Sequence, residues 1–222
     1  MAHSLPGLFA FMRELLPIFL HLRGRRVVLV GAGPVGASKL SQLLAAGADV
    51  RVVAPDVHAD VTGAPVEINR REFRPADLDD AWLVVAAATP EVNRQVAAAA
   101  EERRIFVNAV DDPPNATAYL GGVVRRDGVT VAISTSGEAP AIAGLLREGL
   151  DALLPSDLAA WMATAREARA KWRRDGVPMA QRRPLLLEAL NQLYASREER
   201  RASPELIGVG AATSADTKEG DR

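Results

Sequence analysis

The sequence predicts an α/β fold in which a doubly wound parallel sheet is followed by a small α+β region and a C-terminal helical region. Two observations carry this prediction. Short apolar runs alternate with helical patterns over the first half of the chain, an order that places helices on both faces of a parallel sheet. After Asp111-Asp112-Pro113-Pro114 the pattern changes to a hairpin and then to successive helices.

A glycine-rich turn is the strongest local motif. The apolar run 27–30 predicts a buried strand at 26–31, and residues 34–46 predict a helix. Gly31, Gly33 and Gly36 form a G-x-G-x-x-G turn between them. In that context, backbone N–H groups and the positive end of the helix dipole face a pyrophosphate. The motif predicts a Rossmann-like dinucleotide site. The alternative is a tight turn between strand and helix that binds nothing.

The remaining elements follow from apolar runs and turn residues. Thr89 is expected to be the N-cap, and Pro90 the first residue, of a helix that ends near residue 103. Asp127-Gly128 predicts the turn of a hairpin. Other strands are expected at 49–54, 66–68, 82–87, 105–107, 118–125 and 129–134, and other helices at 140–154, 157–174 and 184–199. The predicted regions are 1–114, 115–155, 156–202 and a disordered tail, 203–222.

Composition excludes several classes of function. The 222 residues carry a net charge of −1, so no overall field attracts nucleic acid or a membrane surface. Cysteine is absent, which excludes disulfides and thiolate chemistry. The apolar stretch 5–22 is interrupted by charged residues and proline, and resembles neither a signal peptide nor a membrane span. We therefore expect a cytoplasmic protein without a nucleic-acid or membrane partner.

The second predicted strand bears on the choice of cofactor. It ends at Ala54-Pro55, and Asp56 follows one step later than the acidic residue that usually contacts the ribose of NAD. Asp56 either reaches a ribose hydroxyl or caps the turn. No arginine stands there to pair with a 2′-phosphate, which favours NAD over NADP.

Few residues are suited to catalysis. His3, His21 and His58 are scattered, so no preformed metal site is expected. Asp111 follows the fifth strand, at the carboxyl edge of the sheet where such folds bind ligands. A carboxylate there is able to take a proton while hydride leaves to a cofactor. The other interpretation is that Asp111 or Asp112 caps a turn before the prolines.

The segment Ser134-Thr135-Ser136-Gly137 precedes a predicted helix. Its hydroxyls and N–H groups either hold a carboxylate or phosphate or simply cap that helix. Arg125, Arg126 and Arg147 flank it and are candidates for binding substrate carboxylates.

Several segments between residues 15 and 155 together form a recognisable pattern. They are Leu16-Pro17-Ile18-Phe19-Leu20, Gly31-Ala32-Gly33-Pro34-Val35 with Lys39, Val52-Val53-Ala54-Pro55, Ala86-Ala87-Ala88-Thr89 with Asn93, Val107-Asn108-Ala109-Val110-Asp111-Asp112-Pro113, Val131-Ala132-Ile133-Ser134-Thr135-Ser136-Gly137, Ala139-Pro140-Ala141 and Leu145-Leu146-Arg147-Glu148. On these segments the chain resembles the precorrin-2 dehydrogenase/sirohydrochlorin ferrochelatase family, the dehydrogenase/chelatase region of siroheme synthases.

The resemblance implies NAD-dependent oxidation of precorrin-2 to sirohydrochlorin on the way to siroheme or cobalamin. In bifunctional members the same site also inserts ferrous iron. It implies a homodimer joined through the region 115–155, and it assigns the catalytic role to Asp111. The competing hypothesis is an NAD-sensing module without catalysis. The predicted cofactor residues are Gly31, Gly33, Pro34, Val35, Gly36, Pro55, Asp56, Thr89 and Asn93, and the predicted substrate residues are Asn108, Ser134, Thr135, Ser136 and Arg147.

Overall fold

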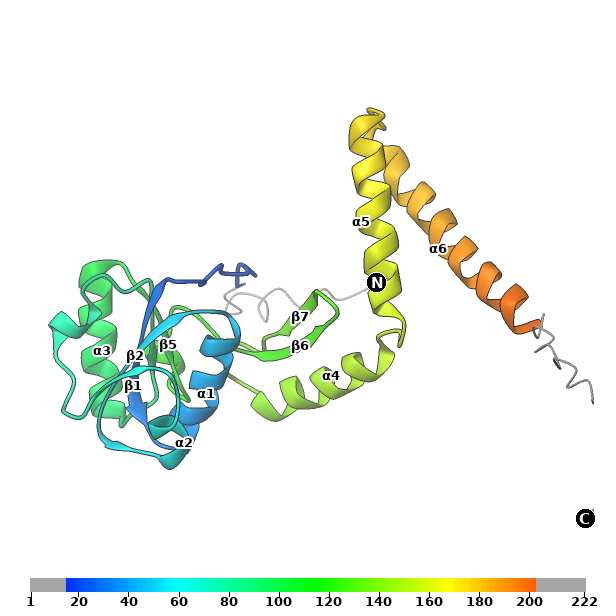
Figure 1. Ribbon diagram of the computed structural model, residues 1–222. Helices are drawn as coiled ribbons and strands as arrows, with labels where there is room; N and C mark the ends of the chain where they lie inside the picture. The colour runs from blue at the N-terminus through cyan, green and yellow to red at the C-terminus, as the bar shows by residue number, and fades with distance from the viewer. Residues whose placement is uncertain (1–14, 203–222) are drawn as a thin grey trace, which may run out of the picture. The chain divides into compact units, whose positions relative to one another are not determined.

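The structure of the protein is a computed structural model that describes residues 15–202 (Figure 1). The chain divides into two compact units. Among the described residues, the first comprises 15–125 together with 129–153, and the second comprises 126–128 and 154–202. The tail 203–222, for which the sequence predicts disorder, lies outside the described residues.

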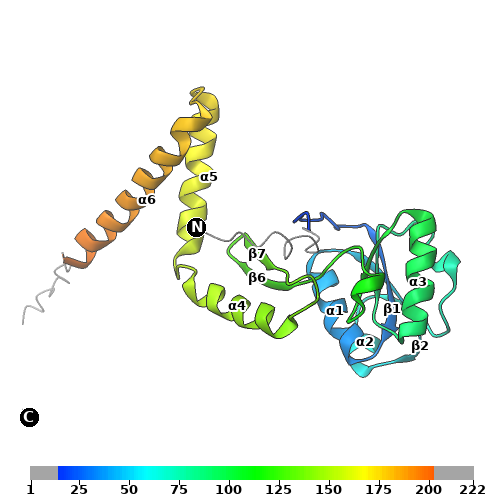
Figure 2. The ribbon, with the colours of Figure 1, turned by 180° about the vertical axis from the view of Figure 1, so that it is seen from behind.

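The first unit is built on a five-stranded sheet in which every neighbouring pair of strands is parallel. The strand order is β3-β2-β1-β4-β5. The sheet is therefore doubly wound, as the sequence predicts. Two main helices lie on opposite faces of the sheet, as Figure 1 and the reverse view in Figure 2 show. The elements are β1 (Arg26–Ala32), α1 (Pro34–Ala45), β2 (Asp49–Val57), α2 (Ala59–Thr62), β3 (Glu67–Asn69), β4 (Leu83–Ala86), α3 (Pro90–Arg103) and β5 (Phe106–Ala109).

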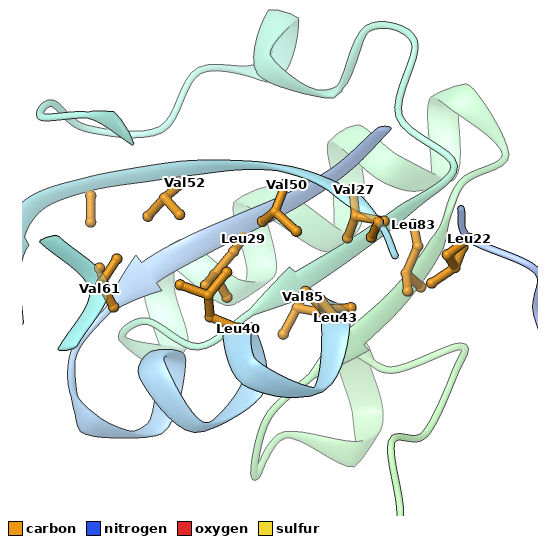
Figure 3. Close-up of a cluster of buried hydrophobic side chains, with 13 residues drawn as sticks. Leu22, Val27, Leu29, Leu40, Leu43, Val50, Val52, Val61, Leu83 and Val85 are labelled. Carbon is orange, nitrogen blue, oxygen red and sulfur yellow. The ribbon is translucent and has the colours of Figure 1, made fainter. Parts of the chain in front are cut away.

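Alternate residues of each strand supply two separate apolar layers. On one face, Val27 and Leu29 of β1 pack with Leu40 and Leu43 of α1 (Figure 3). On the other face, Val28 of β1 packs in the layer that includes α3. Each fully buried aliphatic side chain contributes about 1.5–3 kcal/mol to stability, so these layers fix the strand register.

A buried carboxylate fixes the connection from β3 to β4. Asp77 lies in the 3₁₀-helix η1 (Pro75–Leu78) and is 5% exposed. Its Oδ2 accepts hydrogen bonds from Arg71 Nη1 and from the backbone N–H of Arg74, both at 2.8 Å. Burial raises the pKa of Asp77, but the hydrogen bonds and the charges of Arg71 and Arg51 outweigh burial, and the net pKa is lowered.

Beyond β5 the chain forms the 3₁₀-helix η2 (Pro113–Asn115) and then a hairpin of β6 (Gly122–Arg126) and β7 (Val129–Ile133). Asp127 and Gly128 have φ values of 51° and 86°, the positive pair that a type I′ turn requires, as the sequence predicts. The predicted start of the first hairpin strand at residue 118 is wrong. The N–H groups of Thr117 and Ala118 donate instead to Val107 O, at 2.9 and 2.8 Å. Helix α4 (Pro140–Leu153) follows the hairpin.

The second unit contains the helices α5 (Leu158–Arg174) and α6 (Met179–Ala202). The rings of Trp161 and Tyr194 meet edge to face, with centroids 6.2 Å apart. The predicted start of α6 at residue 184 is wrong, because the helix begins at Met179 and contains Pro184. The preceding residues are good helix formers, and Pro184 removes only the bond to the carbonyl four residues earlier.

Within residues 15–202, no helix combines the length and the apolar character that crossing a bilayer requires.

We predict that Asp77→Asn lowers the free energy of unfolding by about 2 kcal/mol at about pH 7, because a buried hydrogen bond to a charged group is lost. The lowered pKa of Asp77 means that its ionised form stabilises the fold above the usual carboxyl pKa. That contribution disappears as the pH falls through the lowered pKa. Urea denaturation of both proteins across this range should show their difference shrinking at acid pH.

Asp80→Asn is the matched control, because Asp80 is exposed and has a left-handed φ of 66° that asparagine also tolerates. Its free energy of unfolding should change by less than about 0.5 kcal/mol. Equal effects at positions 77 and 80 would contradict the assignment.

Candidate active site

The three glycines of the turn after β1 have different physical roles. Gly31 has a φ of +92°, and a Cβ placed there would lie 2.3 Å from Ala87 O. A Cβ on Gly36 would lie 2.3 Å from Gly31 O. A Cβ on Gly33 would have no neighbour within 4 Å. Gly31 and Gly36 therefore permit close packing of the protein on itself, whereas Gly33 leaves open space in front of α1.

The N-terminus of α1 is equipped to receive an anion. Gly33 is the N-cap and supplies no side-chain hydrogen bond, and the first turn of the helix holds no acidic residue. The first N–H groups of a helix have no partner within it, and Pro34 has no N–H at all. The N–H groups of Val35 and Gly36 are thus the natural donors to a phosphate in the space beside Gly33.

The end of β2 lies differently from the sequence prediction. The strand continues to Val57 instead of ending at residue 54, so Pro55 and Asp56 lie within the strand, close to its carboxyl end. Both residues are exposed. The Asp56 carboxylate makes no hydrogen bond or ion pair with any described residue. No bond among the described residues therefore supports the interpretation in which Asp56 caps a turn.

Thr89 and Asn93 shape the turn after β4. Thr89 Oγ1 accepts the N–H of Val92 at 3.4 Å, which makes it the predicted N-cap of α3. Asn93 is buried, and its Oδ1 accepts the N–H of Ala88 at 3.2 Å. This bond holds the turn that contains Ala87, whose carbonyl approaches Gly31. Asn93 thus supports the segment that packs on the glycine turn, whereas Thr89 caps α3.

The two aspartates after β5 differ in their hydrogen bonds. Both oxygens of Asp112 accept hydrogen bonds from Asn115 Nδ2, at 3.0 and 2.9 Å, so Asp112 holds the turn. Asp111 has no hydrogen bond or ion pair among the described residues, and its φ of 54° is left-handed. Such a conformation costs a non-glycine residue of the order of 1 kcal/mol, and strain of this kind gathers at functional sites.

Asn108, three residues earlier, is 6% exposed. Its Nδ2 donates to Ala118 O at 3.0 Å, which ties the returning chain to β5. Its Oδ1 is buried and has no hydrogen-bond partner in the described chain. An unsatisfied buried acceptor costs about 1–3 kcal/mol, so this oxygen is suited to a donor on a ligand.

A cavity of about 270 Å³ brings Asn108, Asp111 and Asp112 together, and none of the predicted cofactor residues lines it. Gly137 closes part of it, because a Cβ there would lie 3.4 Å from Pro113 and 3.5 Å from the ring of Tyr119. All of the lining residues belong to the first unit. They are Lys39, Asn108, Ala109, Val110, Asp111, Asp112, Pro113, Tyr119, Leu120, Gly121, Gly122, Ser134, Thr135, Gly137, Pro140, Ala143 and Gly144.

The predicted substrate residues divide into two groups. Asn108, Ser134 and Thr135 line the cavity with Asp111, but Ser136 and Arg147 do not. Ser134 Oγ accepts the N–H of Ser136, and Thr135 Oγ1 accepts the N–H of Ala139, so both hydroxyls also shape the start of α4. Arg147 instead pairs with Glu148 at 3.1 Å.

Lys39 is a cavity residue to which the sequence reasoning assigned no role. It is one of only three lysines in the chain, and it stands on the helix that follows the glycine turn. The scarcity of lysine is the feature of the sequence that could have identified Lys39 as a candidate site residue. Burial lowers the pKa of the Lys39 ammonium, and the negative charge of Asp111 partly offsets this effect.

The fold and this site define a dinucleotide-binding α/β protein of the Rossmann type, with an unpaired carboxylate in a cavity at the carboxyl edge of the sheet. Residues 18–122 match the model of a family described as putative NAD(P)-binding.

Similar proteins indicate a more specific family within this class of dinucleotide-binding proteins. A siroheme synthase of Photorhabdus laumondii is 40% identical over 187 residues, which are 82% of this chain and 40% of the relative. Siroheme synthase 3 of Aeromonas hydrophila is 41% identical over 175 residues, which are 77% of this chain and 37% of the relative. The chain belongs to the precorrin-2 dehydrogenase/sirohydrochlorin ferrochelatase family, and it spans about 40% of the length of these relatives.

The fold has a solved counterpart. The structure described as SirC, precorrin-2 dehydrogenase, matches with a TM-score of 0.60 and 23% identity, over 78% of this chain and 88% of that one. This likeness supports the arrangement of the sheet and the elements that follow it.

We predict that Gly33→Ala weakens NAD⁺ binding about tenfold or more, because the new methyl group occupies the space in front of α1. Its φ of −73° suits alanine, so the free energy of unfolding should stay within about 1 kcal/mol of the original. Isothermal titration with NAD⁺ and urea denaturation measure the two effects.

Gly31→Ala is the contrasting variant. Its positive φ and the 2.3 Å approach to Ala87 O should cost about 3 kcal/mol or more in the free energy of unfolding. If Gly33→Ala destabilised the fold as strongly as Gly31→Ala, the separation of roles would be wrong.

Proposed function

We propose that this protein catalyses the NAD-dependent dehydrogenation of precorrin-2 to sirohydrochlorin. The observation that carries the proposal is Asp111, an unpaired carboxylate held at a left-handed φ beside a cavity at the carboxyl edge of the sheet. The family membership and the fitness of the glycine turn for a dinucleotide support it.

The residues present fit the cofactor. The N–H groups of Val35 and Gly36 would hold its pyrophosphate beside Gly33, and Asp56 would accept hydrogen bonds from a ribose hydroxyl. A carboxylate at that position repels a 2′-phosphate, which favours NAD over NADP. The bound cofactor supplies a hydride acceptor.

Asp111 would supply the acid–base half of the reaction. Dehydrogenation removes a hydride from one carbon of the macrocycle and a proton from a neighbouring position, and the remaining electron pair forms the new double bond. NAD⁺ would take up the hydride, and the Asp111 carboxylate would take up the proton. Because no described residue competes for that carboxylate, it is free to accept the proton.

The cavity suits one edge of a large polar ligand. Its volume of about 270 Å³ lies below the range of about 300–1,000 Å³ typical for sites that enclose a whole small molecule. The buried Oδ1 of Asn108 seeks a donor such as a pyrrole N–H, while the hydroxyls of Ser134 and Thr135 can donate to a carboxylate. A tetrapyrrole with carboxylate side chains offers both kinds of group.

The reduced macrocycle and the pyridine nucleotide pool also fit the cytoplasmic location that composition predicts. Iron insertion is the other activity that the family resemblance implies. Within residues 15–202, no group of three histidine or acidic side chains is arranged to hold a metal ion, but in that reaction the macrocycle itself would supply the metal ligands.

We predict that Asp111→Asn lowers kcat for NADH formation from precorrin-2 by about a hundredfold or more, because general-base catalysis typically contributes that much. Asparagine also tolerates a left-handed φ, so the fold and the affinity for NAD⁺ should be retained. Absorbance of NADH measures the rate, and titration measures the affinity.

Asp112→Asn is the matched control, since Asp112 serves the turn with Asn115, and its kcat should fall less than about tenfold. Unchanged turnover in Asp111→Asn would remove the catalytic role but leave the reaction. A wild-type protein that binds NAD⁺ yet never produces NADH from precorrin-2 would favour the sensing module instead.

We also propose that two copies of the chain associate through α4. One face of this helix carries Ile142, Leu145, Leu146 and Leu153, which are 54%, 70%, 49% and 79% exposed. Their spacing places them in one stripe along the helix. Burying each against a second copy would contribute about 1.5–3 kcal/mol, and the family resemblance implies a homodimer through this region.

We predict that Leu145→Glu with Leu146→Glu converts the protein from a dimer to a monomer of 23.7 kDa. The new charges would have to be buried in the interface, which is costly unless they are paired. Light scattering coupled to size-exclusion chromatography measures the mass. Ala45→Glu, at an exposed position on α1, is the control and should leave the mass unchanged.

A further inference from the structure

The cavity contains a positively charged side chain that takes no part in the proposed transfer of hydride and proton. Lys39 is its only basic lining residue among the described ones. The side chain is half-buried, and it forms no hydrogen bond or ion pair with any described residue. An ammonium group that loses water without gaining a partner is unfavourable, so the site is built to receive an anion at that point.

The position of Lys39 on α1 directs it to the cavity. Its neighbour Leu40 packs against the sheet, so α1 is anchored and the backbone of Lys39 is held in place. Side chains on a helix lean toward its N-terminus, here toward the glycine turn and the carboxyl edge of the sheet. Lys39 therefore faces the same space as Asp111 from a different element.

The charges in this space are opposite but not paired with each other. Lys39 and Asp111 interact electrostatically, and neither forms an ion pair in the described chain. A ligand that bridges them must present an anion to Lys39 and a proton donor to Asp111. The carboxylate side chains and ring positions of a tetrapyrrole meet both demands on one molecule.

The flanking arginines are weaker candidates for this role. Arg147 is engaged with Glu148, and neither Arg125 nor Arg147 lines the cavity. The cofactor is the other possible anion, but its pyrophosphate belongs at the helix N-terminus. Lys39 stands five residues further along, about 7.5 Å of helix rise away.

We infer that Lys39 binds a carboxylate side chain of the tetrapyrrole substrate and so sets the position of the ring against Asp111. This inference rests on the proposed function and names a specificity-determining residue within it. Lys39 is a positioning residue: it fixes which edge of the macrocycle enters the cavity, while Asp111 performs the proton transfer.

The test compares Lys39→Met and Lys39→Arg with the wild type in NADH formation from precorrin-2. Lys39→Met should raise KM for precorrin-2 about tenfold to a hundredfold, with KM for NAD⁺ within about threefold of the original. Lys39→Arg, which keeps the charge, should recover most of the loss. The rise of KM with ionic strength should be shallower in Lys39→Met than in the wild type.

The control is Arg94→Met, which removes an exposed cation from α3 that pairs with Glu91 and lines no part of the cavity. It should leave both KM values unchanged. Thermal denaturation of each variant verifies that the fold is retained. A KM for precorrin-2 that is unchanged in Lys39→Met overturns the inference, and so does a selective rise in KM for NAD⁺.

Direct binding separates this inference from the proposed function. Sirohydrochlorin titrated into the wild type and Lys39→Met, followed by its absorbance, requires no turnover. If the wild type forms no NADH but binds sirohydrochlorin more tightly than Lys39→Met does, the reaction is wrong and the carboxylate site stands. Equal affinity of the two proteins overturns the site, whatever the reaction proves to be.

Discussion

The close contact between the turn after β1, the turn after β4 and the first turn of α1 is the constraint on which the site depends. Ala87 O approaches Gly31, and Gly31 O approaches Gly36, at distances that exclude any Cβ. Asn93 holds the β4 side of this contact through Ala88. Because the three segments are locked together, α1 starts at a fixed place over the sheet edge, and both Gly33 and Lys39 are carried by that helix.

The same edge of the sheet concentrates polar groups that the apolar layers cannot accommodate. Asn108 leaves one side-chain oxygen without a partner, and Asp111 adopts a conformation that costs energy. Natural sequences tolerate such departures from local preference mainly where a ligand compensates them. The surrounding sheet, with two well-packed faces, provides enough stability to hold both groups in place.

The sheet could be predicted from sequence because its signals are local. The glycine turn, the Thr89 cap and the Asp127-Gly128 turn each depend on a few adjacent residues, and the structure contains all three. The start of β6 could not be predicted, because the N–H groups of Thr117 and Ala118 bond to Val107, ten and eleven residues earlier in the chain. No pattern in residues 117–121 distinguishes that pairing from a hairpin strand.

The site itself was only partly predictable for the same reason. Position after a strand identified Asp111, but only the bond from Asn115 to Asp112 shows which aspartate serves the turn. Lys39 lines the cavity with residues about 70–100 positions away in sequence, a juxtaposition that no spacing rule contains. Arg147 illustrates the converse, because proximity in sequence to Ser134 did not bring it to the cavity.

The segment that carries Asp111 leaves β5 and returns to the same strand, where Thr117 and Ala118 are fastened to Val107. Both ends of the segment are therefore held at β5. The entropy of closing such a loop grows only with the logarithm of its length. Insertions between these anchors would reshape the mouth of the cavity without shifting the sheet, so this is where a lineage could change the ligands that the cavity admits while keeping the dinucleotide turn.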